Sequence, residues 1–213
     1  MEERTELLAL SCRDFAGQTA SAAPTPGGGS AAAYAGTLGM ALVNMVARLT
    51  LGKKKYAGVE AEVAELLDKG EQIRETLLAT VQADADAFAP LAAAYALPAG
   101  TDGEKAAKAA ELSARSHTAA SIPFQGAQAA VEGLEIARRI AECGSRLVIS
   151  DAGCGAALLL AAVKSFDFTV RINLGAVQDK KFVNEAAQEM AALVARATSL
   201  EEETRRLANE RLL

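Results

Sequence analysis

The chain has 213 residues, of which 51% are hydrophobic and only 4% are aromatic, with no tryptophan. This length supports one sizeable core, so we expect a single domain over residues 1–213, and the abundance of alanine and leucine favours packed helices over a sheet sandwich. The net charge of -5 provides no basic face for a nucleic acid. The sequence therefore predicts an all-α protein, a helical bundle with long central helices.

The first ten residues, MEERTELLAL, are acidic and are typical of the start of an amphipathic helix, not of a secretory signal. The three cysteines are odd in number, far apart and outside any C-x-x-C pair: Cys12, Cys143 and Cys154. They indicate neither a disulfide framework nor a zinc site. These features predict a cytoplasmic protein with no bound metal.

Residues 31–51 form the most apolar run, and it is long enough to span a membrane. Asn44 and Arg48 interrupt this run, and we expect no second long apolar span. Small residues recur four positions apart, as in Ala32 and Gly36, which lets another helix backbone approach closely. The run therefore predicts a buried central helix and no membrane span.

A long helix is predicted from about Gly58 to Leu97 by apolar residues in alternating steps of three and four. This stripe contains Val59, Val63, Leu66, Gly70, Ile73, Leu77, Val81, Phe88 and Leu91. Asp84 falls within the stripe, so its carboxylate is expected to face the core, where a charged group is a candidate for proton transfer. The alternative is that the stripe ends in solvent, or that the helix breaks near Pro90.

Two further helices are expected after the turn LPAGTDG. Asp102 is predicted to cap the first, and Pro123 suits the first turn of the second, which runs to about Cys143. Ser150 and Asp151 are then expected to open a second buried helix, AGCGAALLLAAVKS.

The last part of the chain contains a strand-like segment and a final helix. Residues 166–174, FDFTVRINL, alternate like a strand but have no partner strand, so we expect an extended connector that could pair across a dimer axis. A long helix with one apolar face is predicted after Asp179.

The residue patterns leave the chemistry open. Free amides at PGGGS could face an anion or a polar ligand edge, but no Walker or Rossmann pattern accompanies them, and the glycines could simply turn the chain. The single histidine, His117, lies in a polar stretch and is expected at the surface. Asp151 could be a helix cap, and Lys53 to Lys55 a solvated helix exit. Carboxylate acid–base chemistry beside cationic side chains is the remaining enzymatic interpretation.

Several motifs taken in order resemble one family. They are APTPGGGSAAA, LTLGKKKY, DADAF followed by AAYALP, EKAAKAA, ISDAG and VRINL. The chain resembles the cyclodeaminase/cyclohydrolase family from roughly Leu7 to Leu207. That family includes the cyclodeaminase domain of formiminotransferase-cyclodeaminase and stand-alone bacterial methenyltetrahydrofolate cyclohydrolases.

The resemblance implies an all-helical homodimer that acts on a tetrahydrofolate derivative without metal or cofactor. It implies Asp84 as the acid/base, with Asp151 orienting the substrate or sharing the proton transfer. The implied substrate-binding residues are Gly27, Gly28, Gly29 and Ser30 at the pterin ring, with Lys53, Lys54 and Arg171 at the glutamate tail.

Three functions remain open at this stage. Formiminotetrahydrofolate cyclodeaminase, which closes the methenyl ring and releases ammonia, is placed first. Methenyltetrahydrofolate cyclohydrolase, which opens that ring with water to give 10-formyltetrahydrofolate, is a close alternative. The third is a helical scaffold that binds folate or a partner protein without turnover.

Overall fold

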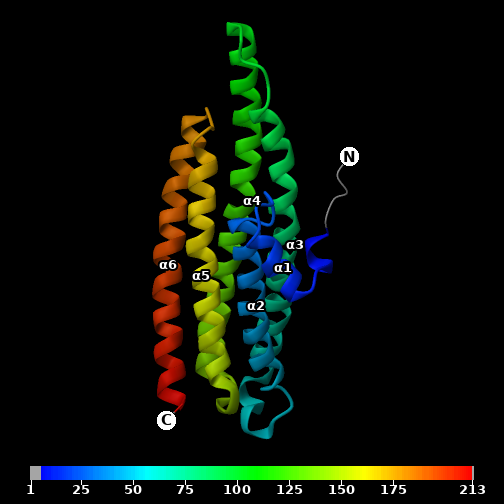
Figure 1. Ribbon diagram of the computed structural model, residues 1–213. Coiled ribbons are helices and arrows are strands. Elements are labelled where there is room, and N and C mark those ends of the chain that lie inside the picture. Colours follow the sequence, from blue (N-terminus) through cyan, green and yellow to red (C-terminus); the bar gives the residue numbers. More distant parts are fainter. Residues whose placement is uncertain (1–5, 213) are drawn as a thin grey trace.

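Helices make up nearly all of residues 6–212, the part of the chain that the computed structural model describes (Figure 1). Six α-helices run in this part: α1 (Cys12–Thr19), α2 (Gly28–Arg48), α3 (Glu60–Tyr95), α4 (Asp102–Cys143), α5 (Ile149–Leu174) and α6 (Lys180–Leu212). Three short 3-10 helices join them: η1 (Leu7–Ala9), η2 (Lys54–Val59) and η3 (Arg146–Val148). No strand occurs among the described residues, and the predicted all-α class is confirmed.

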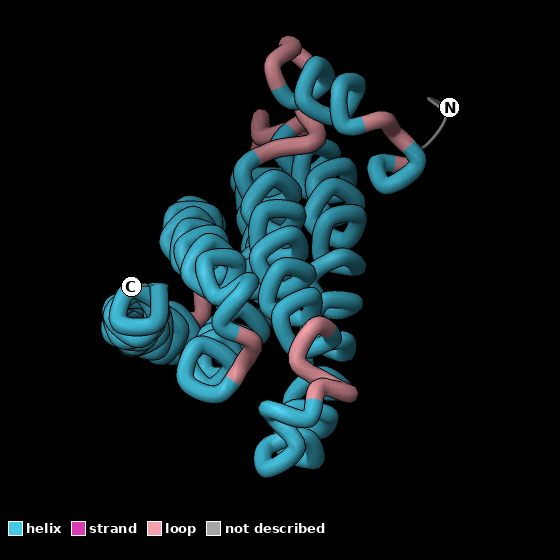
Figure 2. Tube along the Cα trace, turned by 90° about the horizontal axis from the view of Figure 1, so that it is seen from below, coloured by secondary structure: helices cyan, strands magenta, loops and turns pink. Residues whose placement is uncertain are grey.

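The long helices lie side by side in an elongated bundle (Figures 1 and 2). At its centre α2 and α5 run antiparallel, with their backbones in contact. A Cβ at Gly39 would lie 2.8 Å from the carbonyl oxygen of Gly155, and a Cβ at Gly155 would lie 2.6 Å from that of Gly39. Only glycine permits this approach. The small residues of the first apolar run therefore serve close helix packing, as predicted.

The long predicted helix around Asp84 is confirmed as α3. Pro90 lies inside α3 without ending it. Most of the predicted stripe is buried, including Val63, Ile73 and Leu77, whereas Phe88 is exposed. The stripe is therefore interrupted by an exposed side chain at Phe88 and is buried again at Leu91.

Two predicted boundaries on α4 are wrong. A single helix continues through Pro123, which lies in its interior and does not open a new helix. The N-cap is Thr101 and not Asp102: the Thr101 hydroxyl accepts from the Glu104 amide, and the Glu104 carboxylate accepts from the Thr101 amide. This reciprocal pair satisfies two amides at once, which a cap at Asp102 would not do.

The extended connector predicted for residues 166–174 is also wrong, because these residues form the last turns of α5. Aromatic and β-branched residues favour strands, but burial of Phe166 and Val170 against the bundle gives the helix tertiary contacts that override this preference. The helix predicted after Asp179 is confirmed as α6, and Asp179 caps it, since its Oδ1 accepts from the amides of Lys181 and Phe182 at 3.0 and 3.2 Å.

The N-terminal prediction is wrong in its described part. Leu7–Ala9 form one 3-10 turn, and the first α-helix starts only at Cys12, capped by the Ser11 hydroxyl. Residues 1–5, where the predicted helix begins, lie outside the described residues. The part of the N-terminus that contains η1 and α1 lies on the outside of the bundle (Figure 1), and the Leu7 side chain is buried.

Two helices are long and apolar enough to cross a membrane, namely α2 and the span Arg146–Leu174. The expectation of a single long apolar run is therefore wrong. Core helices have the same length and composition, and α2 is covered by α3, α4 and α5 along most of its length. The span containing α5 is less covered, so it leaves apolar surface exposed.

Candidate active site

The start of α2 and the side chain of Asp84 form one unit. Gly27, the N-cap of α2, has no side chain to bind the free amides of the first turn. The Asp84 carboxylate on α3 takes that place, because the Ser30 hydroxyl donates to Asp84 Oδ2 at 3.0 Å and the Ser30 amide donates to the same carboxylate. A carboxylate from another helix thus caps α2.

Gly29 makes this arrangement possible. A Cβ at Gly29 would lie 2.6 Å from Asp84 Oδ2, closer than real side-chain contacts allow. At Gly27, by contrast, a Cβ would meet nothing within 4 Å. The glycine run therefore does more than turn the chain: at Gly29 it admits a carboxylate against the backbone.

The environment changes the acidity of Asp84. Burial raises the pKa of its carboxyl above the ordinary value, while the two hydrogen bonds from Ser30 lower it. The effect of burial is larger, because the charged form loses hydration. The Asp84 carboxyl thus holds its proton to a higher pH than an ordinary aspartate does.

A cleft of about 380 Å³ opens beside this carboxylate. The loop before α2 and residues Gly27–Gly29 form one wall, and Phe88 and Tyr95 of α3 form another. Thr169 and Asn173 of α5 close it. The cleft combines aromatic surface, backbone amides and one acid, which suits a flat polar ligand.

Arg171 lies at the same end of the molecule. It borders a shallow groove with Gly28, Phe168 and Ile172, next to the cleft. Its Nε donates to Asp167 Oδ1 at 2.8 Å, and this partner raises the pKa of Arg171 further. The structure therefore places Arg171 at the end of the molecule that carries Asp84, Ser30 and the glycines, in the groove next to the cleft.

The structure does not bring Lys53, Lys54 and Asp151 to this cleft within one chain. The lysines follow α2, a helix of 21 residues, so about 30 Å of helix separates them from Gly28. Lys53 Nζ donates instead to Ser145 Oγ at 3.1 Å. Asp151 lies in the first turn of α5, about 27 Å along that helix from Thr169. The residues predicted to act together form two groups at opposite ends of the α2–α5 pair.

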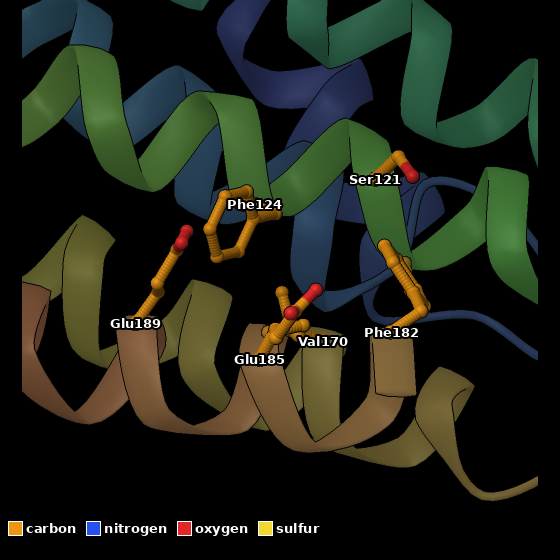
Figure 3. Close-up of a pocket in the computed structure, with 8 residues that line it drawn as sticks. Ser121, Phe124, Val170, Phe182, Glu185 and Glu189 are labelled. Carbon is orange, nitrogen blue, oxygen red and sulfur yellow. The ribbon is translucent and has the colours of Figure 1, made fainter. Parts of the chain in front are cut away.

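A second, smaller cavity of about 180 Å³ lies between α4 and α6 (Figure 3). Phe124 and Phe182 line it, with Glu185 and Glu189 on the α6 side. The exposed His117 packs its ring against Phe182 at 4.0 Å between centroids. None of the predicted site residues lies there, and no group of three or more possible metal ligands occurs in residues 6–212.

The sequence prediction missed the α5 wall of the cleft. Thr169, Ile172 and Asn173 share one helical face, because Ile172 and Asn173 follow Thr169 by three and four residues. The motif VRINL contained the signal, but an extended segment would send its side chains to alternate sides. Recognising this segment as helix would have placed Ile172 and Asn173 on one face with Thr169.

A carboxyl group of raised pKa, hydrogen-bonded at a helix N-terminus and open to a small-molecule cleft, is typical of an enzyme that uses acid–base catalysis. In this case the scaffold is an all-α bundle. The sequence model of the formiminotransferase-cyclodeaminase family matches residues 11–192, and the chain belongs to that family.

Individual relatives agree with this assignment. The chain is 42% identical over 183 residues to a methenyltetrahydrofolate cyclohydrolase of Methylorubrum extorquens, covering 86% of this chain and 88% of that protein. It is 29% identical over 191 residues to the formimidoyltransferase-cyclodeaminase of Mus musculus, covering 90% of this chain but only 35% of that protein. The crystal structure of formiminotetrahydrofolate cyclodeaminase from Thermotoga maritima matches with a TM-score of 0.85 at 26% identity, over 98% of this chain and all of that one. The resemblance stated from the motifs is confirmed.

Proposed function

We propose that this chain is a methenyltetrahydrofolate cyclohydrolase, with Asp84 as its acid/base. The similarity to a stand-alone cyclohydrolase spans most of both chains at 42% identity, and it supports placing the cyclohydrolase ahead of the cyclodeaminase. The order is the reverse of the one drawn from the motifs alone. The observation that carries the catalytic assignment is the Asp84 carboxylate, which lies partly buried against Gly29 and Ser30 at an open cleft.

The reaction requires one proton acceptor and one proton donor. Water attacks the methenyl carbon, a C–O bond forms, and the bond from that carbon to the 5-nitrogen breaks to give 10-formyltetrahydrofolate. The ionised Asp84 would accept a proton from the attacking water and return it to the departing nitrogen. The second proton of that water is released to solvent as the formyl C=O forms, so the cationic substrate gives a neutral product and one proton. The negative carboxylate would also stabilise the cationic methenyl bridge. No metal or cofactor enters this proposal.

Formiminotetrahydrofolate cyclodeaminase is the second candidate. The observation that favours it is the fold match to the Thermotoga maritima cyclodeaminase over nearly the whole chain. Both reactions pass through the methenyl bridge, so one cleft can serve either. In this case Asp84 would donate a proton to the departing ammonia.

The decisive experiment follows the methenyl chromophore. Purified protein is incubated separately with 5,10-methenyl- and 5-formiminotetrahydrofolate, each compared with buffer alone. Loss of the chromophore from the first substrate identifies a cyclohydrolase, and its appearance from the second identifies a cyclodeaminase. Absence of both reactions, with folate binding retained, would favour the non-catalytic scaffold.

Asp84→Asn tests the role of the carboxylate. It should lower kcat by at least about 100-fold, the usual contribution of a positioned acid/base. Asp68→Asn is the matched control, because Asp68 is exposed on the same helix and lies outside the cleft. Full activity of Asp84→Asn in both assays would refute the assignment.

We also propose that the protein is a homodimer that pairs through the outer face of α2 and α5. Leu38 and Met45 of α2 and Leu49, which directly follows it, are exposed at steps of seven and four, and Phe168 and Ile172 of α5 are exposed to 76% and 78%. These stripes lie on the side of the α2–α5 pair away from α3 and α4. A self-complementary face of this kind suits a two-fold dimer.

Such a dimer would reunite the two separated groups of predicted site residues. Because a two-fold axis that lies in the contact plane and is perpendicular to α2 reverses the direction of α2, the end of one subunit that carries Asp84 would meet the partner's end that carries Lys53, Lys54 and Asp151. The lysines could then contact the glutamate tail together with Arg171.

The free thiols of Cys12, Cys143 and Cys154 suit the cytoplasmic location that we propose.

The dimer face can be tested by charge. Leu38→Glu and Phe168→Glu should each shift sedimentation from dimer to monomer, since each places a carboxylate in the apolar contact. At position 38, midway along α2 and near the two-fold axis, the two carboxylates would also face each other. Leu147→Glu, at an exposed position in η3 before α5, is a useful comparison. A wild-type protein that remains monomeric at every concentration would refute the dimer.

A further inference from the structure

The Asn173 amide is held in one orientation beside Asp84. Its Nδ2 donates to the carbonyl oxygen of Ala119 at 3.1 Å and to that of Thr169 at 2.9 Å. Both amide hydrogens are therefore engaged by backbone acceptors, and this network distinguishes Nδ2 from Oδ1. A flipped amide would place Oδ1 against two carbonyl oxygens.

Pro123 explains why the Ala119 carbonyl is available. In a helix this carbonyl would accept from the amide of the residue four positions later, which is Pro123. Proline has no N–H, and its ring pushes the carbonyl of Ala119 away from the helix axis. Asn173 of α5 supplies the missing donor across the helix contact. The proline inside α4 thus fixes a side chain on α5.

The Oδ1 atom of Asn173 remains for a ligand. It has no hydrogen-bond partner among the described residues, and it is not among their fully buried unpaired polar atoms. The Asn173 side chain lines the cleft that also contains Asp84, Gly29 and Thr169. An acceptor of fixed orientation therefore faces the place where a substrate would lie.

We propose that Asn173 is a substrate-positioning residue whose Oδ1 accepts a hydrogen bond from an N–H donor of the ligand ring, and that Pro123 sets its orientation through Ala119. This inference rests on the proposed function, since the reduced pterin ring of a tetrahydrofolate carries such donors on its pyrimidine side. A fixed acceptor in a cleft discriminates against rings that lack a donor, because it would be left unpaired. Asn173 thus orients the ring while Asp84 acts on the one-carbon bridge.

Measuring both the ligand affinity and the melting temperature of variants separates this positioning role from a structural one. The probe is 5-formyltetrahydrofolate, measured by titration calorimetry, with the melting temperature measured for each variant. Asn173→Ala should weaken binding roughly tenfold and lower the melting temperature, because it removes both the acceptor and the donor to Ala119. Asn184→Ala, at an exposed position on α6, is the matched control.

Pro123→Ala provides the sharper test. It restores an N–H for the Ala119 carbonyl, so the helix should be as stable as before or more so, yet binding should weaken about threefold or more because Asn173 loses its fixed orientation. In the double variant Pro123→Ala/Asn173→Ala, the melting temperature should recover while the tenfold loss of affinity remains. A purely structural Asn173 would instead regain affinity together with stability.

The outcomes distinguish the two levels of proposal. Wild-type protein that binds the probe, with unchanged affinity in Asn173→Ala or recovered affinity in the double variant, would overturn the role of Asn173 and leave the proposed function intact. Wild-type protein that neither binds the probe nor turns over a folate would overturn both.

Discussion

The Asp84 carboxylate occupies the position that a side chain at Gly29 would need. A Cβ at Gly29 would lie 2.6 Å from Asp84 Oδ2 and nearer still to Oδ1. The absence of a side chain on α2 thus determines where the carboxylate of α3 can lie. The Ser30 hydroxyl and amide then hold that carboxylate at the end of α2. Ser30 and Asp84 are 54 residues apart in the sequence, yet the glycine run that ends at Ser30 and the acid form one structural unit.

Gly29→Ala should therefore displace the catalytic group. The added methyl group collides with the Asp84 carboxylate, so we expect a loss of about 1–3 kcal/mol in the free energy of unfolding and at least a 100-fold loss of kcat/KM. Denaturant unfolding and the chromophore assay measure these effects. Gly17→Ala is the control, because a Cβ there meets nothing within 4 Å. Normal activity of Gly29→Ala would show that the carboxylate position is unimportant for turnover.

Ser30→Ala should shift the pH profile of the reaction. The Ser30 hydroxyl favours the ionised carboxylate and lowers the pKa of Asp84, so its removal raises that pKa further. If ionised Asp84 is the base, kcat/KM falls as the pH drops through this pKa. The acid limb of the variant should therefore lie at higher pH than that of the wild type, with a larger loss at about pH 6 than at about pH 8.

The control is Thr76→Ala, which removes a hydroxyl that bonds only within α3, to the carbonyl oxygen of Gln72. Its profile should coincide with that of the wild type. An acid limb that stays in place in Ser30→Ala would mean that a group other than Asp84 titrates there.

The sequence was sufficient to predict the helical class, the buried first apolar helix and the inward position of Asp84. These features follow from local periodicity, because a carboxylate seven residues after Leu77 and four before Phe88 lies on the same helical face. The family resemblance implied that Asp84, Gly29 and Ser30 serve one site, but their direct contact was not predicted. It joins two helices, and no periodicity within either helix encodes it.

Two errors had tertiary causes. Residues 166–174 have strand-like side chains, but the burial of Phe166 and Val170 in the bundle favours helix. Pro123 was expected at a helix start, where its missing amide costs nothing. Inside α4 that missing amide is compensated by the side chain of Asn173, which lies 54 residues from Ala119 in the sequence. The donor that makes the proline tolerable is visible only when α4 and α5 are packed together.

The stability of the protein should depend on the ionisation of Asp84. Because burial raises the pKa of Asp84 in the folded state above its unfolded value, the folded state binds more protons than the unfolded state between these two values. Its contribution to stability is complete below the unfolded pKa and is lost as pH rises through the folded pKa. Each pKa unit of difference between the folded and unfolded states corresponds to about 1.4 kcal/mol in the free energy of unfolding.

Asp84→Asn removes this titration. The melting temperature of the variant relative to that of the wild type should therefore increase as pH rises from about 4 to about 7. Thermal unfolding at a series of pH values measures the difference, and Asp68→Asn should show no such trend. If the melting temperature of Asp84→Asn minus that of the wild type stays constant or decreases as pH rises, a raised pKa for Asp84 is contradicted.

A mixing experiment tests whether each cleft draws residues from two subunits. Asp84 lies at one end of the α2–α5 pair and Asp151 at the other, so the proposed dimer would build each site from Asp84 of one subunit and Asp151 of its partner. Homodimers of Asp84→Asn and of Asp151→Asn should each be nearly inactive. After subunit exchange, half of the dimers are mixed and each has one site with both acids intact. Equal mixtures should therefore recover about a quarter of wild-type activity.

The control is a mixture of Asp84→Asn with the double variant Asp84→Asn/Asp151→Asn, which contains no intact site in any pairing. It should remain inactive. If both acids acted within one chain, the mixed dimers of the single variants would also contain no intact site, and no activity would return. Full activity of Asp151→Asn alone would show instead that this residue only caps α5, since a carboxylate in the first turn is stabilised by the helix dipole.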